Sequence, residues 1–194
     1  MDKLSYALGM SLAYNLVQSG IKDIDIESFT KAFSAVVGNA NPDMSTQEAN
    51  QTIQAYFSQK QGTASTKNKA EGEAFLAQNK TKEGVIVLPS GLQYEILKEG
   101  TGPKPKATDR VKTHYHGTLI DGTVFDSSVQ RGQPSTFGVN QVIKGWVEAL
   151  QLMPLGSKWR LYIPSDLAYG SQGAGGSIEP DSALIFDIEL LGIE

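Results

Sequence analysis

Seven large side chains in the second half of the chain are candidates for a binding site. One carboxylate accompanies them: Asp126 directly follows Phe125 and could accept a hydrogen bond from a tyrosine hydroxyl. Trp146 and Tyr169 each adjoin a glycine, and each carries a polar tip that needs a partner when it is buried. Such residues more often form a core, but they also suit an apolar cavity with a few polar groups. The set is Tyr115, Phe125, Val142, Ile143, Trp146, Tyr169 and Phe186.

The common catalytic arrangements are absent from this sequence. There is no cysteine, which excludes thiol catalysis and thiolate metal sites, and no Gly-x-Ser-x-Gly motif. The glycine-rich run at 170–176 lacks the Lys-Ser/Thr ending of a phosphate-binding loop, so we interpret it as a flexible loop. His114 and His116 lie two apart on an expected strand, but two ligands without a third make a weak metal site. We therefore predict no metal and no cofactor.

Composition and charge exclude several classes of protein. The net charge is −4, which does not suit binding to a nucleic acid backbone. No apolar run approaches the roughly 18–20 residues of a membrane-spanning helix. The first ten residues do not have the pattern of a signal peptide. We expect a cytoplasmic protein, or a periplasmic or outer-membrane-associated one if a signal sequence has been removed.

The two parts of the chain differ in secondary structure. Of the 20 glycines, fifteen follow residue 80, as do seven of the eight prolines. Because these residues interrupt helices, the first part is predicted to be helical and the second rich in strands. The strands are expected at 92–96, 111–115, 159–163 and 184–190, where apolar and polar residues alternate, with one helix at 145–152. This pattern predicts an α+β fold with an antiparallel sheet covered by one short helix.

The helical part has apolar faces that exceed what it can bury alone. Leucines recur every four residues from Leu4 to Leu16, and a second apolar face runs from Ile26 to Val37. Small domains bury too little surface to be stable, so a second copy of the chain is the simplest partner. A third helix is expected from about residue 46. It either continues to about 81 or breaks at Gly62-Thr63.

Several blocks of the second half resemble the FKBP family of macrolide-binding peptidyl-prolyl isomerases. The first block runs from His114 to Ser128, and later blocks follow in the same order. The resemblance covers roughly residues 88–194. The first half is similar to the amino-terminal region of bacterial FKBPs of the macrophage infectivity potentiator type. The later blocks are Val142-Ile143-Lys144-Gly145-Trp146, Ile163-Pro164, Ala168-Tyr169-Gly170 and 184–191.

The resemblance implies a domain organisation and partners. Residues 1–57 would form a helical dimerisation domain, residues 58–87 a connecting helix or linker, and residues 88–194 the isomerase domain. The expected partners are prolyl peptides, unfolded proteins, a second copy of the chain, and macrolides such as tacrolimus and rapamycin.

The resemblance also implies a pocket with Trp146 as its floor. Its walls and its substrate- or macrolide-binding positions would be Tyr115, Phe125, Asp126, Arg131, Val142, Ile143, Tyr169, Ile178 and Phe186. The chain departs from the family pattern at His116, Ser135, Ala174 and Glu179. None of these positions is the floor or Asp126.

An apolar pocket of this kind could catalyse rotation about X-Pro bonds. The barrier of ~18–20 kcal/mol comes from amide resonance, and no nucleophile is required to lower it. Tyr169 and the Ile143 N–H would donate to substrate carbonyls. Asp126 would either orient Tyr115 or polarise the site near the twisted carbonyl. The alternative is a chaperone module that binds prolyl peptides without catalysis, and a third possibility is a purely structural dimerisation protein.

Overall fold

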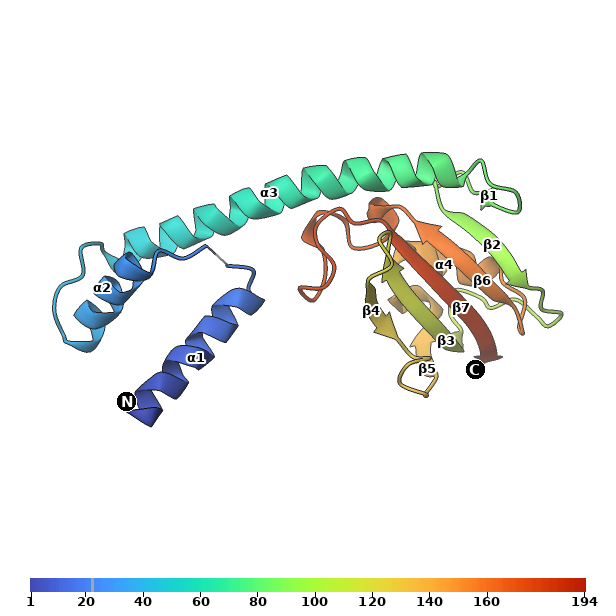
Figure 1. Ribbon diagram of the computed structural model, residues 1–194. Helices are drawn as coiled ribbons and strands as arrows, with labels where there is room; N and C mark the ends of the chain where they lie inside the picture. The colour runs from blue at the N-terminus through green and yellow to red at the C-terminus, as the bar shows by residue number, and fades with distance from the viewer. Residues whose placement is uncertain (22) are drawn as a thin grey trace. The chain divides into compact units, whose positions relative to one another are not determined.

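A computed structural model describes residues 1–21 and 23–194 of the protein (Figure 1). The chain divides into two compact units, Met1–Ala55 and Tyr56–Glu194, and each is described here by itself. None of the helices in the described residues combines the length and the apolarity needed to cross a membrane.

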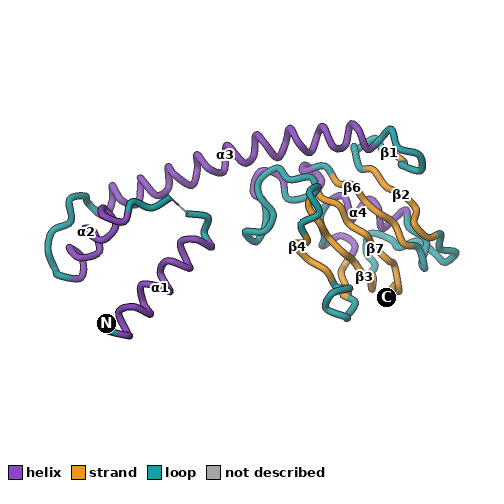
Figure 2. The backbone as a smooth tube through the Cα atoms, viewed as in Figure 1, coloured by secondary structure: helices purple, strands orange, loops and turns teal. Residues whose placement is uncertain are grey.

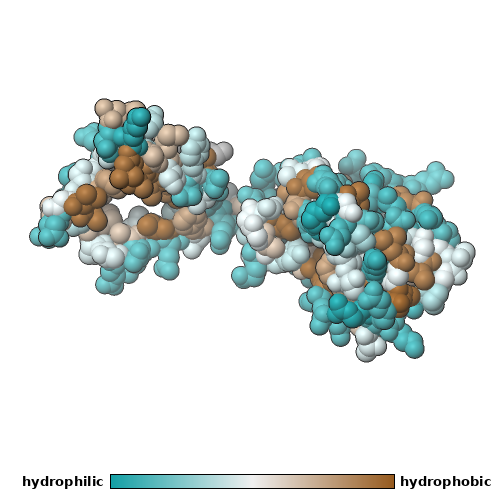
Figure 3. Space-filling model, turned by 90° about the horizontal axis from the view of Figure 1, so that it is seen from below, coloured by the Kyte–Doolittle hydropathy of each residue, from teal (hydrophilic) through white to brown (hydrophobic). Residues whose placement is uncertain are grey.

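Two short helices make up most of the first unit. Asp2 and Asp25 cap them by accepting hydrogen bonds from the backbone N–H groups of Ser5 and Ser28, at 2.7 and 2.8 Å. Gly20 follows the first helix with φ +77°, in the left-handed region that ends helices. Neither helix has a buried residue within the chain, as the brown surface of this unit in Figure 3 illustrates. The bounds are α1 Lys3–Gln18 and α2 Ile26–Val37.

The third helix, α3, is unbroken over 34 residues, from Thr46 to Asn79. Gly62 lies inside it, where nothing stands within 4 Å of the position of a Cβ atom. A single interior glycine costs roughly 1 kcal/mol relative to alanine, which a long helix tolerates. Of the two possibilities left open by the sequence, the continuous helix is therefore the correct one.

The second unit is built on a seven-stranded antiparallel sheet (Figure 2). The strand order is β1-β2-β6-β7-β3-β4, and β5 pairs with β3. The long strands β3 and β7 lie side by side in the middle of the sheet, with Tyr115 opposite Ile188. The bounds are β1 Ile86–Val87, β2 Gln93–Lys98, β3 Arg110–Leu119, β4 Val124–Ser127, β5 Ser135–Gly138, β6 Lys158–Ile163 and β7 Leu184–Ile193.

Helices cover both faces of this sheet. Helix α4, Lys144–Leu152, lies on one face, where Gly145 allows Ile163 of β6 to approach closely. The preceding residue, Tyr162, points the other way and packs against Phe75 of α3 at 5.9 Å between ring centroids. Asn79 of α3 also donates to Gln93 of β2 at 3.0 Å. The last part of α3 is thus packed on the sheet.

The predicted α+β class is confirmed, with helices first and a sheet wrapped on one short helix afterwards. The alternation of β7 places Leu184, Phe186, Ile188 and Leu190 in the core. The four strands predicted from alternation are present, and β1, β4 and β5 are additional. The domain boundaries at residues 57 and 87 stay predictions.

Candidate active site

A cavity of about 630 Å³ opens between the sheet and α4. Its walls come from β3, β4, β5, β7, α4 and the loop that follows the 3-10 turn η3, Gly170–Gln172. Most of the lining residues are apolar or aromatic, as in sites that bind small apolar groups. They are Tyr115, Phe125, Asp126, Phe137, Gln141, Val142, Ile143, Trp146, Tyr169, Ala174, Gly175, Ser177, Ile178 and Phe186.

Trp146 forms the centre of an aromatic cluster in this cavity. It is only 4% exposed and lies in the first turn of α4. Its ring meets three others nearly edge-on, which is a favourable arrangement for aromatic quadrupoles. The centroid distances are 5.5 Å to Tyr115, 5.1 Å to Phe186 and 5.7 Å to Phe137. The indole face is held by its neighbours before any ligand binds.

A glycine in β3 makes room for this cluster. An ideal Cβ atom on Gly117 would stand 2.7 Å from ring carbons of both Phe125 and Phe186. These two rings lie edge to face, with centroids 5.4 Å apart. Because residue 117 is a glycine, the rings of Phe125 and Phe186 can pack directly against the backbone of β3.

Asp126 anchors a small polar network at the edge of the cavity. The Tyr115 hydroxyl donates to Asp126 Oδ2 at 2.6 Å. Arg131 donates to the other carboxylate oxygen, and its Nη2 donates to the Tyr115 hydroxyl at 2.7 Å. The three groups hold one another in a fixed geometry, with the Arg131 guanidinium 5.6 Å from the Tyr115 ring centroid.

The pKa values in this network follow from its contacts. Partial burial raises the pKa of Asp126, but hydrogen bonds from Tyr115 and Arg131 and the charge of Arg131 outweigh burial, so the net shift is downward. Burial, then the hydrogen bond to Asp126, raises the pKa of Tyr115. At neutral pH the carboxylate is charged and the phenol is protonated.

Three hydrogen-bond donors at the cavity have no acceptor in the described part of the chain. They are the Trp146 indole N–H, the Ile143 backbone N–H and the Tyr169 hydroxyl. Tyr169 is 39% exposed, and burial followed by the negative charge of Asp126 raises its pKa, so the hydroxyl stays protonated. Ile143 is the residue just before α4. Donors that face an apolar cavity can bind carbonyl oxygens of a ligand.

The structure brings together nine of the ten residues predicted for the site. Arg131 is not among the lining residues, because its side chain turns to Asp126 and Tyr115. Sequence reasoning missed Phe137, although it named Ser135, two residues earlier, as a departure from the family pattern. Since strand side chains alternate, Phe137 lies on the same face of β5 as Ser135. The spacing of two residues between Ser135 and Phe137 could therefore have indicated that Phe137 lines the cavity.

The two histidines are paired with serines. His114 Nδ1 lies 3.0 Å from Ser128 Oγ, and His116 Nδ1 lies 2.9 Å from Ser127 Oγ. In residues 1–21 and 23–194 no group of three or more potential ligands is placed to hold a metal ion.

Comparisons with known proteins identify both parts of the chain. Residues 102–191 match the family model of FKBP-type peptidyl-prolyl cis-trans isomerases, and residues 1–96 match the model of the domain amino-terminal to it. The outer membrane protein MIP of Legionella longbeachae is 44% identical over the whole chain and 85% of its own length. The FKBP-type 22 kDa peptidyl-prolyl cis-trans isomerase of Escherichia coli is 43% identical over 97% of the chain and 93% of its own length.

A solved structure shows the same architecture. The crystal structure of FkpA from Escherichia coli superposes with a TM-score of 0.73 at 35% identity, covering 99% of this chain and 95% of that one. The catalytic interpretation therefore stands over the two others considered from the sequence. The chain belongs to the FKBP-type peptidyl-prolyl cis-trans isomerases, in the subgroup related to MIP and FkpA that carries an amino-terminal domain.

Proposed function

We propose that the cavity above Trp146 is where this isomerase binds the prolyl ring and rotates the preceding peptide bond. The observation that supports this most directly is the combination of a pre-packed indole with three donors that have no acceptor within residues 1–21 and 23–194. The prolyl ring would stack on Trp146, enclosed by Phe125 and Phe186. Tyr169 and the Ile143 N–H would bind the carbonyl groups on either side.

Catalysis would come from favouring the twisted amide over the planar one. A twisted amide has less resonance and a less polar carbonyl, so an apolar enclosure stabilises it relative to the ground state. Asp126, held at 2.6 Å from the Tyr115 hydroxyl, would orient that ring and present a fixed negative charge at the cavity edge. The two roles considered for Asp126 from the sequence, orienting Tyr115 and polarising the site near the twisted carbonyl, are therefore compatible with the same geometry. No proton transfer is needed.

The two tryptophans provide a matched test of this site. Trp146 and Trp159 are both 4% exposed, and neither indole N–H has an acceptor among the described residues. Only Trp146 lines the cavity, whereas Trp159 stacks on Tyr94 with centroids 4.3 Å apart. We expect Trp146→Phe to lower kcat/KM on a prolyl tetrapeptide by about tenfold, or ~1.4 kcal/mol of transition-state stabilisation. Trp159→Phe serves as the control for loss of core volume, and equal activities of the two variants would contradict the site.

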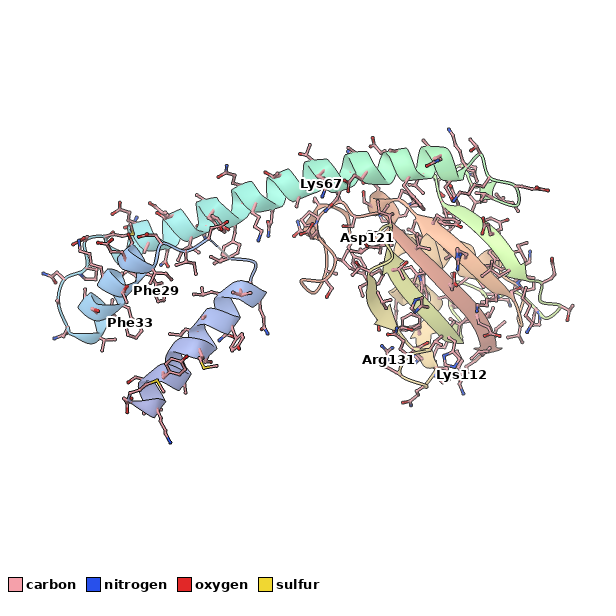
Figure 4. All side chains as sticks on the ribbon, in the orientation of Figure 1. Phe29, Phe33, Lys67, Lys112, Asp121 and Arg131 are labelled. Carbon is pink, nitrogen blue, oxygen red and sulfur yellow. The ribbon has the colours of Figure 1, made fainter. Side chains whose placement is uncertain are left out.

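We further propose that residues 1–57 form a homodimer. The exposed apolar side chains of α1 and α2 support this, among them Phe29 and Phe33, which stack on one face of α2 with centroids 6.4 Å apart (Figure 4). Contiguous apolar surface of this kind is unusual on a monomer, and a symmetric pairing would cover it in both copies.

A dimer would hold an unfolded chain better than a single pocket. Two linked sites raise the effective concentration of the second without new contacts, often by orders of magnitude. We propose that this chaperone-like holding accelerates refolding limited by proline isomerisation. The test compares the wild-type chain with a monomeric variant of the same length, such as Leu8→Lys/Leu12→Lys. Equal acceleration per active site would show that dimerisation only joins two independent enzymes.

The same cavity is our proposed macrolide site. Tacrolimus and rapamycin present a proline-like ring, and Ile143 and Tyr169 offer donors for its carbonyls. Competitive inhibition of tetrapeptide isomerisation that Trp146→Phe weakens would support this. Inhibition that is unchanged in the variant would place the macrolide elsewhere.

A relative of the chain bears on its cellular location. One relative is named an outer membrane protein, which supports the periplasmic or outer-membrane alternative over the cytoplasmic expectation. We propose that alternative, and cell fractionation with an antibody to the native protein tests it.

A further inference from the structure

The loop between η3 and β7 forms one wall of the cavity. Ala174, Gly175, Ser177 and Ile178 all line it. A small antiparallel bridge ties the loop to itself: Ala174 N–H donates to the Ile178 carbonyl at 2.8 Å, and Ile178 N–H donates back at 3.0 Å. The position of this bridge sets the position of Ile178 in the cavity wall.

The opposite side of the same loop contacts helix α3. Ser65 Oγ donates to Asp181 Oδ2 at 2.5 Å. Asn68 Nδ2 lies 3.2 Å from Glu179 Oε2 and 3.0 Å from the Pro180 carbonyl oxygen, and donates to both. In Figure 4 the labelled Lys67, between these two α3 residues, marks where the helix passes over the loop.

The helix approaches the loop closely one turn further on. A Cβ atom on Gly72 would stand 3.0 Å from the Cβ atom of Ala183. Between helix, loop and the turn after β3 lies a second hollow of about 350 Å³, and Ser177 borders both this hollow and the cavity. The loop therefore separates the cavity from the hollow, and α3 packs against the side of the loop that faces the hollow.

The loop needs such a support because its backbone is not regular. Gly173, Gly175 and Gly176 all have φ near +60 to +70°, and Asp181 has φ +56° without being a glycine. Within residues 1–21 and 23–194, the side-chain hydrogen bonds that reach residues 170–183 from outside the loop all come from Ser65 and Asn68. Without them the loop would be held by its chain ends and by the packing of Ala174 and Ile178 against the core.

We infer that Ser65 and Asn68 are positioning residues for catalysis: they hold the loop in the conformation in which Ala174 and Ile178 complete the cavity. This inference rests on the proposal that the cavity is the prolyl site. When a competent conformation is populated only in part, the apparent affinity falls by that fraction. Loss of contacts made equally in the ground and transition states raises KM and leaves kcat unchanged.

The test uses the full-length chain carrying Ser65→Ala and Asn68→Ala together. The double variant loses three hydrogen bonds, two of them to carboxylate oxygens, and all three are at least partly exposed. We expect a KM increase of roughly three- to tenfold on a prolyl tetrapeptide, with kcat unchanged. The matched control is Ser58→Ala with Asn50→Ala, two exposed positions of the same helix. Both pairs increase helix propensity alike, so a difference between them comes from the loop contacts.

Two further measurements separate positioning from folding. A merely structural role would reduce the fraction of active enzyme, which lowers apparent kcat and leaves KM unchanged. Positioning predicts faster amide exchange at Ala174 and Ile178 in the double variant, and a KM near that of the wild type in the conservative single variant Ser65→Thr, which keeps the hydroxyl. If the KM of the Ser65→Ala/Asn68→Ala variant is unchanged while Trp146→Phe clearly loses activity, the positioning inference is overturned but the proposed prolyl site is not. Full activity of Trp146→Phe would instead overturn the proposed site.

Discussion

Replacing Leu8 and Leu12 with lysine is expected to convert the proposed dimer into monomers. Both leucines lie on α1, one turn apart, and so occupy the same face of the helix. Leu8 is 57% exposed and Leu12 is 42% exposed within the single chain. A lysine at either position would place an ammonium group in an apolar interface.

The magnitude follows from the area that remains exposed. Together the two exposed fractions amount to about one whole leucine side chain, and burying one contributes roughly 1.5–3 kcal/mol. In a symmetric dimer each contact occurs twice, so the variant loses roughly 3–6 kcal/mol of association free energy. That loss corresponds to a dissociation constant about 10²- to 10⁴-fold higher. Desolvation of the ammonium groups increases it further.

The assay is light scattering or sedimentation of full-length chains at micromolar concentration. The matched control replaces Leu191 on β7 with lysine, because this leucine is also 42% exposed but lies in the second unit, Tyr56–Glu194. We expect a dimer for the wild type and the control, and a monomer for the double variant. Circular dichroism of the double variant records whether α1 stays folded. A wild-type chain that is monomeric well above micromolar concentration would refute the reasoning, as would a double variant that is still dimeric.

Two further predictions concern the cavity. Asp126 has a pKa below its ordinary value of 3.8, so its charge and the stability it contributes should persist as the pH falls from 8 to that value and be lost only at lower pH. Isomerase activity of the wild type should therefore be flat down to about pH 5, whereas activity that titrates near neutral pH would contradict this. Gly117→Ala should push apart Phe125 and Phe186, destabilise the chain by about 1–3 kcal/mol and lower kcat/KM. Gly192→Ala, whose Cβ would meet its neighbour at an ordinary 3.5 Å, is the control in thermal unfolding and activity assays.

Strong periodicity made much of the fold predictable. The alternation from Leu184 to Leu190 indicated a strand, and it is the strand that supplies four core residues. The helix at Gly145–Leu152 was expected and begins one residue earlier. By contrast, β4 and β5 are four residues each, too short for alternation to be distinguished from a loop. They exist because β3 offers hydrogen-bonding partners, which no local pattern records.

The site was predictable where a side chain itself faces the cavity. Trp146 and Asp126 stand in blocks of the chain that resemble the FKBP family, and both line it. The contacts of Arg131 could be found only in the structure, because its contact with Asp126 depends on how the chain turns after β4. The Ile143 N–H has no acceptor in the described part of the chain because of the backbone course just before α4, and side-chain patterns do not report this course.

The contact between α3 and the loop before β7 shows why a polar segment can be mistaken for a simple connector. Residues 58–69 are nearly all polar, and the family resemblance implied a connecting helix or linker over residues 58–87. Yet Ser65 and Asn68 reach the loop through hydrogen bonds, and Gly72 allows close approach, so none of these contacts needs an apolar side chain. A fragment beginning after α3 would lose this support together with the first unit. Any difference in its activity would then mix two causes, a loosened cavity wall and the loss of the proposed dimer. Point substitutions in α1 and in α3 change one of these at a time, and only they can assign an effect on refolding to one of the two.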